Sequence, residues 1–382
     1  MRCYGRTTVA EFLEDMVVYR NLEPMDRRLP RFAEIAERVG LPTSPVPRKA
    51  EPAYGQAMAK LLQAAQNLDK PRAPLRRLLF LGDTRLNDST AFRNIKAAGG
   101  WPGWAFIASE DLSHPPNAEV EEDLFLANRW GALGEFLRFL EEQGFPLDEG
   151  TGAIIDLDKT AIGARGRNHS MIDQVRVEAV RRTVEGLLGE RFDEPMFQDA
   201  YDELNQEGYH PLTADNQDYL AYMCLMISAG AYGLQELLDD LAEGRISTFH
   251  QFIEKVEGRL RDDPDPQLAP IHDAIYANVQ TGDPTPFKSF RYGEYERTVA
   301  RMGYLSDEAS SEEFLAEEIV ITQEVREAAH YLLERGALLF GLSDKPDEAS
   351  VPRPEQAARG MQAIHRVETH AVGESIADQL AD

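Results

Sequence analysis

The chain has 382 residues, 43% of them hydrophobic, and its 66 acidic against 40 basic side chains give a net charge of −26 at pH 7. This length predicts two compact units or one core with a large insertion, and the negative charge argues against nucleic acid or anionic membrane surfaces as partners. With two cysteines, Cys3 and Cys224, neither a disulfide framework nor a cysteine-based zinc site is expected. Residues 1–6 lack the apolar segment of a signal peptide, and no stretch approaches the roughly 18 apolar residues of a membrane span, so we expect a soluble cytoplasmic protein.

The first 160 residues alternate between helical and strand patterns. Amphipathic periodicity predicts helices, and short apolar runs that end in glycine or aspartate predict buried strands. Two strands separated by a helix indicate a right-handed parallel crossover. The predicted elements, in chain order, are helices within 7–40 and at 52–68, strands at 78–81 and 104–108, a helix around 119–143 and a strand at 153–155.

The pattern changes after residue 160, where long amphipathic stretches predict a block of helices. A helix at 322–335, with Thr322 as its N-cap, and a strand at 337–342 then return to the earlier pattern. Because strands bracket the helical block, we expect it to be an insertion. Residues 347–382 are polar and give no strong prediction. The helical stretches of the block are 171–189, 195–207, 216–241 and 248–261.

The segment with the clearest chemical signal is the apolar strand that ends in two aspartates, Asp156 and Asp158, with Thr160 two residues further on. Residues just past the carboxyl end of a strand in an open α/β sheet are where ligands bind. Buried carboxylates are costly unless a cation accompanies them, and Mg²⁺ prefers oxygen ligands. The segment therefore predicts metal-assisted chemistry on a phosphate group.

Three strand-end motifs together resemble those of the haloacid dehalogenase-like (HAD) superfamily, whose members are mostly Mg²⁺-dependent phosphohydrolases. The first motif is matched by Ile154-Ile155-Asp156-Leu157-Asp158-Lys159-Thr160, the second by an apolar strand that ends at Ser343, and the acidic fourth motif by Gly82-Asp83-Thr84-Arg85-Leu86-Asn87-Asp88. The order departs from the family, because the acidic motif precedes Asp156 here. A circular permutation reconciles this order, since a sheet depends on strand position and chain termini often lie close together.

The third motif of the family is a basic residue one helix before the acidic strand. Lys49, at the start of the predicted helix 52–68, is our choice for it, although Arg48, Lys60 and Lys70 compete. The resemblance then implies a Rossmann-like α/β core with a parallel sheet, formed by residues 1–160 and 320–382, and a large helical cap of the C1 type at 161–319.

The resemblance also implies roles for the motif residues. Asp156 would be the nucleophile that forms an aspartyl-phosphate, and Asp158 would be the general acid and base. Ser343 would bind a phosphate oxygen, and Lys49 would compensate negative charge. The implied Mg²⁺ ligands are Asp83, the carboxylate of Asp156 and the backbone carbonyl of Asp158, with Asp88 as a further ligand or as an anchor. Each aspartate also has a structural interpretation as a helix cap or turn residue.

Three cations outside the core motifs are candidates for substrate contacts. Arg165 follows the first motif directly, and Lys288 and Arg291 lie in a segment rich in turn formers and aromatic residues. Such a combination suits an anionic or stacked ligand. The alternatives are a solvent-exposed arginine and a loop that its aromatic residues fix to the core.

The predicted function is therefore hydrolysis or transfer of the phosphoryl group of a small phosphate monoester, with Mg²⁺ as cofactor. Sugar phosphates, nucleotides and phosphorylated acids all remain candidate substrates, and the sequence leaves the oligomeric state open. One alternative is a non-catalytic HAD-like binding or regulatory protein. Another is an unrelated carboxylate-rich metalloprotein, in which Asp83 would lie far from Asp156.

Overall fold

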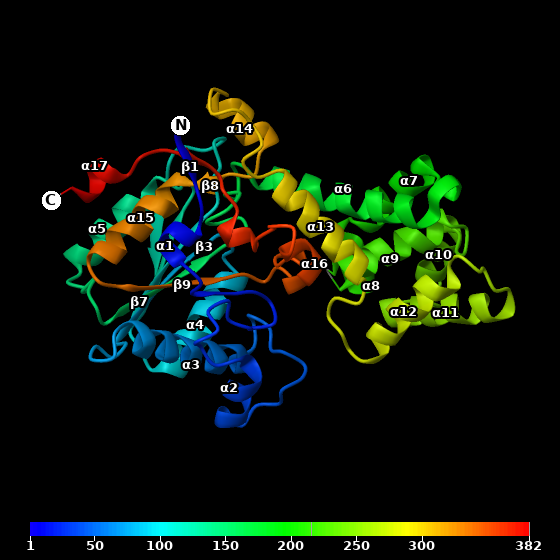
Figure 1. Ribbon diagram of the computed structural model, residues 1–382, viewed down its shortest axis with the longest axis horizontal. Helices are drawn as coiled ribbons and strands as arrows, with labels where there is room; N and C mark the ends of the chain where they lie inside the picture. Colours follow the sequence, from blue (N-terminus) through cyan, green and yellow to red (C-terminus); the bar gives the residue numbers. More distant parts are fainter. Residues whose placement is uncertain (215, 382) are drawn as a thin grey trace. The chain divides into compact units, whose positions relative to one another are not determined.

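The computed structural model describes residues 1–214 and 216–381, and the chain divides into two compact units. The first unit comprises Met1–Gln174 and Thr298–Asp382, and the second comprises Val175–Arg297. Figure 1 shows the strands of the described chain in the first unit and helices in the second. Among the described residues, no helix has both the length and the apolar character that crossing a bilayer requires.

A seven-stranded sheet forms the centre of the first unit. Its neighbouring strands are parallel except for the edge strand β5, which runs antiparallel to β6. The prediction of an α/β fold with a mostly parallel sheet is confirmed, and the architecture is compatible with a Rossmann-like fold. From one edge to the other, the strands are β2 (Val17–Val18), β9 (Leu338–Leu342), β7 (Thr151–Asp156), β3 (Arg77–Gly82), β4 (Gly103–Ala108), β6 (Leu124–Ala127) and β5 (Ala118–Glu121).

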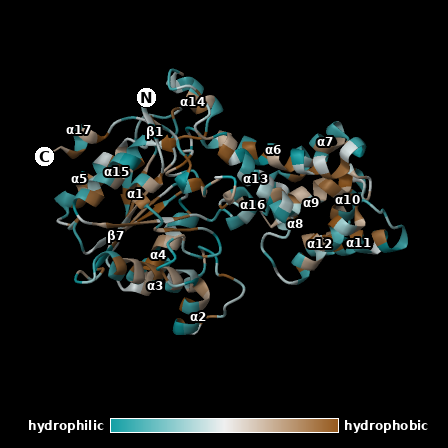
Figure 2. Cartoon of the chain, in the orientation of Figure 1, coloured by the Kyte–Doolittle hydropathy of each residue, from teal (hydrophilic) through white to brown (hydrophobic). Residues whose placement is uncertain are grey.

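Helices cover both faces of this sheet, which is why its central strands are apolar along their whole length. On one face, Phe80 and Ile154 belong to the same buried cluster as residues of the helices that follow and precede β3. On the other face, Phe106 of β4 contacts Phe136. In Figure 2 the central strands around β7 carry the hydrophobic colour. The helices of the unit are α1 (Ala10–Leu13), α2 (Phe32–Val39), α3 (Pro52–Asp69), α4 (Asn87–Gly99), α5 (Ala132–Glu142), α14 (Ser311–Glu317), α15 (Gln323–Glu334), α16 (Pro354–Ala357) and α17 (Ala377–Leu380).

The predicted helix around 119–143 is wrong in its first half. Residues 118–127 form the hairpin of β5 and β6, which turns at Glu122 with a positive φ of 53°, and α5 begins only at Ala132. The hairpin forms because β6 pairs with β4 and buries Leu124 and Phe125 against it. Tertiary pairing of this kind overrides local helical preference.

The first unit also contains a three-stranded sheet, and the unit extends further along the chain than predicted. Its strands are β1 (Arg2–Thr7), β10 (Thr369–Gly373) and β8 (Ile321–Thr322). The prediction assigned 161–319 to the insertion, but 161–174 and 298–319 belong to the first unit. One reason is the buried Asn168, whose side chain bonds to the backbone of Leu315, Glu318 and Val320.

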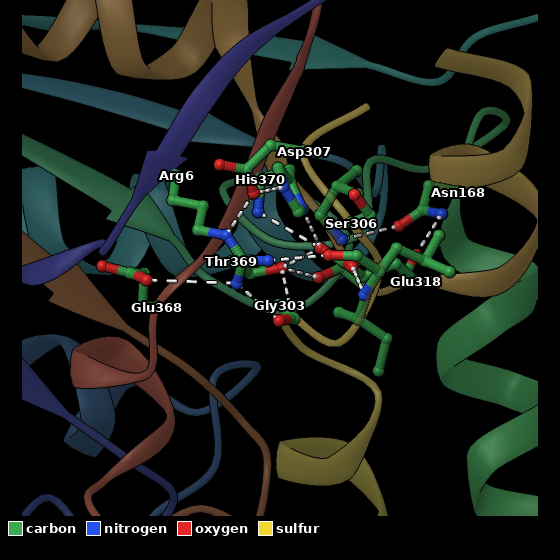
Figure 3. Close-up of polar contacts among 12 residues, drawn as sticks. Arg6, Asn168, Gly303, Ser306, Asp307, Glu318, Glu368, Thr369 and His370 are labelled. Carbon is green, nitrogen blue, oxygen red and sulfur yellow. Dashed lines mark hydrogen bonds and ion pairs between the residues drawn. The ribbon is translucent and has the colours of Figure 1, made fainter. Parts of the chain in front are cut away.

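The buried carboxylate of Glu318 also holds the segment before α15 to β10, as Figure 3 shows. Glu318 accepts hydrogen bonds from His370 Nδ1 at 2.7 Å, Thr369 Oγ1 at 2.8 Å and the backbone N–H of Leu305 at 3.0 Å. The second ring nitrogen of His370, Nε2, lies 3.1 Å from Asp307 Oδ1. Burial alone would raise the pKa of Glu318, but these hydrogen bonds lower it below its ordinary value. The segment before α15 is therefore tied to β10 by charge as well as by packing.

The second unit consists of helices around its own apolar core. That core includes Tyr222, Phe249 and Phe252, all buried. The predicted helix 216–241 is two helices, because the chain reverses at Gly230, where φ is +75°. The helices of this part of the chain are α6 (His169–Leu188, which begins in the first unit), α7 (Glu194–Leu204), α8 (His210–Thr213), α9 (Gln217–Ser228), α10 (Leu234–Ala242), α11 (Phe249–Asp262), α12 (Ala269–Gln280) and α13 (Lys288–Ala300, which ends in the first unit).

Candidate functional site

The candidate site lies at the carboxyl ends of three adjacent parallel strands, β9, β7 and β3. Asp156 is the last residue of the central strand β7 and pairs in register with Leu342 of β9. Ser343 follows β9 directly, and Asp83 follows β3 directly. Because parallel strands end at one edge of a sheet, residues that are far apart in the chain meet there.

Three carboxylates and one lysine form the centre of this site. Asp83, Asp88 and Asp156 are 6%, 1% and 3% exposed, and each offers an oxygen within 4.8 Å of the oxygens offered by the other two. Lys49 Nζ lies 2.6 Å from Asp156 Oδ1 and 2.9 Å from Asp88 Oδ1. It also lies 3.9 Å from Asp344 Oδ2. The structure thus brings together the four buried residues that the sequence assigned to the first, third and fourth motifs.

The loop after β3 holds Asp88 in place. Asp88 Oδ2 accepts hydrogen bonds from the backbone N–H groups of Asp83 at 3.0 Å and Thr84 at 2.9 Å, and from Thr84 Oγ1 at 2.8 Å. Gly82 is required here, since a Cβ at this position would lie 2.8 Å from the Asp88 side chain. One oxygen of Asp88 therefore fixes the loop, and the other faces Lys49.

The three carboxylates of the site could hold a metal ion. Burial raises the pKa of Asp83 to about 7, with the charge of Asp88 adding to the effect. Burial also raises the pKa of Asp156; the charge of Lys49 opposes this rise, and the charges of Asp88 and Asp83 add to it. Asp88 alone stays acidic: burial opposes its ionisation, but Lys49 and Thr84 lower its pKa to about 2. Three oxygen donors with an excess of negative charge match the preference of a hard divalent cation such as Mg²⁺.

Lys49 is charged at neutral pH despite its burial. Desolvation alone would lower its pKa, but the carboxylates of Asp156 and Asp88 raise it well above the ordinary value. Lys49 and its two carboxylate partners thus stabilise one another's charged forms.

The segment after β7 turns sharply and presents further polar groups. Lys159 has a positive φ of 66°, and Asp158 forms a bridge with Ile162. Thr160 Oγ1 donates to Asp156 Oδ2 at 3.3 Å. Arg165 Nε donates a hydrogen bond to Asp83 Oδ2. Arg165, which was predicted to contact the substrate, therefore lies beside the carboxylate cluster.

Asp158 and Ser343 line a small cavity of about 20 Å³ in the first unit. Lys345 and Tyr19 line the same cavity. The sequence analysis missed both as site residues, although Lys345 lies within the serine motif. Ser343 Oγ accepts a hydrogen bond from the backbone N–H of Lys345 at 3.0 Å, which fixes the loop after β9.

Lys288 and Arg291 lie in the second unit and have protein partners there. Arg291 is 4% exposed and pairs with Asp218 at 2.5 Å and with Glu294 at 2.7 Å. Lys288 Nζ lies 2.8 Å from Asp283 Oδ2. These ion pairs give both cations a structural role within the helical unit, and a contact with substrate stays a prediction.

Comparisons of the chain with protein-family models, with curated proteins and with solved structures give no match. Fold and site together define an α/β protein with a buried carboxylate–lysine centre at the carboxyl edge of its parallel sheet.

Proposed function

We propose that the protein is a Mg²⁺-dependent phosphatase or phosphotransferase of the HAD type, which acts on a small phosphate monoester. The observation that carries this proposal is the meeting of Lys49 with Asp156 and Asp88, next to Asp83, at the ends of adjacent parallel strands. The neighbours of β7 supply the serine on one side and the acidic pair on the other. This spatial arrangement supports the family resemblance even though the chain order is permuted.

The residues present would hold a magnesium ion through Asp83, Asp156 and the backbone carbonyl of Asp158, with Asp88 anchoring the loop. A bound Mg²⁺ would neutralise part of the charge that develops on the phosphoryl oxygens. Lys49 offsets part of the negative charge of Asp156 and Asp88, so it reduces the repulsion that an anionic substrate meets at this edge. In this proposal, the second unit is the cap, because it interrupts the chain between Asp156 and Ser343.

The proposed reaction has two displacements. An Asp156 carboxylate oxygen forms a bond to phosphorus as the ester P–O bond breaks, and Asp158 donates its proton to the leaving alkoxide. Asp158 then takes a proton from the second nucleophile as that nucleophile attacks phosphorus, and the bond between phosphorus and Asp156 breaks. Ser343 donates a hydrogen bond to a phosphoryl oxygen through both steps.

The test is release of inorganic phosphate from a panel of sugar phosphates, nucleotides, phosphorylated acids and p-nitrophenyl phosphate, with Mg²⁺ and with a chelator. We expect metal-dependent release by the wild type and its loss in Asp156→Asn. Asp69→Asn is the matched control, because Asp69 ends α3 and its carboxylate pairs with the neighbouring Lys70. If the folded wild type releases phosphate from no ester, the proposal is wrong and a binding protein becomes the better interpretation.

A further inference from the structure

Arg165 has a backbone that is held in place beside the carboxylate cluster. Its N–H donates to the backbone carbonyl of Lys159 at 2.8 Å. Its own carbonyl accepts from the backbone N–H of Glu110 at 3.0 Å and from Trp130 Nε1 at 3.1 Å. Trp130 is fully buried, and Glu110 is 6% exposed. The main chain of Arg165 is therefore fixed at three points, next to the residues that form the proposed phosphoryl site.

The two residues that follow restrict this segment further. Gly166 has a φ of +80°, and a Cβ at this position would overlap the backbone carbonyl of Glu110, so the chain requires glycine there. Arg167, whose side chain is 3% exposed, pairs with Glu110 at 2.6 Å and with Glu324 at 2.9 Å. Arg165 thus extends from a rigid support, which reduces the entropy that its ordering by a ligand would cost.

The guanidinium of Arg165 has donors that the protein does not use. Nε donates to Asp83 Oδ2, whereas Nη1 and Nη2 donate to no residue in the part of the chain that the structure describes. The side chain is 33% exposed, so a ligand can reach it. Nη1 and Nη2 carry four of the five N–H groups of a guanidinium. Their planar arrangement matches the two oxygens of a carboxylate or of a phosphate.

Two other cations at this edge of the sheet are paired with carboxylates. Lys49 lies 2.6 Å from the proposed nucleophile, so it serves the phosphoryl group. Arg85 Nη2 donates to both carboxylate oxygens of Glu121, at 2.7 and 2.6 Å. Arg165 contacts Asp83 at the margin of the cluster and is therefore placed for a second group of the substrate. In a chain with a net charge of −26, an arginine held open at this margin favours an anion.

We propose that Arg165 binds a carboxylate of the substrate, so that the substrate is the phosphate ester of a hydroxy acid. This inference rests on the proposed function and names the substrate class of the same site. A carboxylate fits better than a second phosphate, because it brings less negative charge toward Asp83, Asp88 and Asp156. The neutral leaving group of a sugar phosphate or a nucleoside monophosphate would offer the Nη donors only uncharged acceptors, whose hydrogen bonds are weaker.

The experiment compares pairs of esters that differ by a carboxylate in place of a CH₂OH group, with Mg²⁺ present. One pair is 3-phosphoglycerate and glycerol 1-phosphate of the same configuration, and the other is 6-phosphogluconate and glucitol 6-phosphate. We expect the wild type to prefer the acid of at least one pair by roughly ten- to hundredfold in kcat/KM. Arg165→Gln should abolish this preference by raising the KM of the acid, and Arg165→Lys should keep part of it. Arg93→Gln is the control, because Arg93 is an exposed arginine of α4 that pairs with Glu122.

A binding measurement gives a result that does not depend on turnover. In calorimetric titrations of Asp156→Asn, the preferred acid should bind more tightly than its matched polyol phosphate, and adding Arg165→Gln should remove the difference. Equal kcat/KM within both pairs in the wild type would refute the inference and leave the proposed function in place. The same would follow if Arg165→Gln slowed acid and polyol esters equally, because Arg165 would then act on the shared phosphoryl group or on Asp83. If the folded protein releases phosphate from no ester, p-nitrophenyl phosphate included, the proposed function itself is wrong.

Discussion

Replacing Lys49 with methionine removes the only lysine or arginine that contacts both Asp156 and Asp88 among the described residues, while it keeps a chain of similar length. Removing one partner of a buried ion pair typically costs about 3–5 kcal/mol, because the other charge stays buried without compensation. Here the ammonium lies 2.6 and 2.9 Å from two carboxylates. We therefore expect Lys49→Met to lower the free energy of unfolding by about 3–5 kcal/mol at pH 7.

The pH dependence of this loss has a definite sign. The pKa of Lys49 is raised in the folded state, so its contribution to stability is fully present below its unfolded pKa of about 10.4 and thus throughout the acid and neutral range. Without Lys49, the pKa of Asp88 rises from its folded value of about 2, so this carboxyl binds a proton more readily in the variant. The difference between wild type and variant should therefore shrink as the pH falls from 7 to 5.

Urea denaturation followed by tryptophan fluorescence is the assay, with the midpoint and slope fitted together. The three tryptophans, Trp101, Trp104 and Trp130, all lie in the first unit, so the signal reports on the unit that contains the site. Lys60→Met, at an exposed position of α3, should stay within about 0.5 kcal/mol of the wild type. A Lys49→Met variant equally close to the wild type at pH 7, or a deficit that grows at pH 5, would refute the reasoning.

Further predictions concern the metal, the loop after β3 and the buried carboxylate of Figure 3. The pKa of Asp83 is raised to about 7, so the stability it contributes is fully present below about pH 3.9 and is lost as the pH rises through 7. Mg²⁺ should therefore raise the Tm of the wild type more at pH 8 than at pH 6. If Mg²⁺ raised the Tm of Asp83→Asn as much as that of the wild type, this prediction would be contradicted. Gly82→Ala places a Cβ 2.8 Å from the side chain of Asp88, so it should lower the free energy of unfolding by about 1–3 kcal/mol, measured by urea denaturation. It should also reduce the rise in Tm that Mg²⁺ causes. Glu318→Gln keeps the shape but not the charge that faces His370, so we expect a loss of about 1–3 kcal/mol in urea; a neutral result would show that this charge does not hold the segment.

The sequence predicts best where an apolar strand ends in a polar residue. The strands that end near Asp83, Asp156 and Ser343 were located to within a few residues, because full burial in a parallel sheet leaves a nearly continuous apolar run. The hairpin of β5 and β6 was missed for the opposite reason. Its strands are short, one of them is exposed, and only pairing with β4 distinguishes them from a helix.

Long-range polar contacts outside the motifs were not predicted. Tyr19 and His365 lie 346 positions apart, and neither is marked by a motif. The boundary of the helical unit was misplaced for the same reason. Hydrogen bonds of Asn168 and Glu318 hold the segments around them in the first unit, although the local sequence pattern of these segments is helical. Such contacts depend on where strands and loops come together in space, which hydrophobic periodicity does not encode.

The order of the motifs along the chain matters less than the order of the strands in the sheet. β7 lies between β9 and β3, so Asp156 has the loop of Ser343 on one side and the loop of Asp83 and Asp88 on the other. This arrangement does not depend on which segment comes first in the sequence. Lys49 reaches the same edge from just before α3, a helix that packs against this sheet, and closes the cluster with two ion pairs. A cut and rejoining of the chain at its surface leaves every one of these neighbours unchanged. The permuted order is therefore no argument against phosphoryl-transfer chemistry at this site, and only the reactivity of Asp156 can decide it.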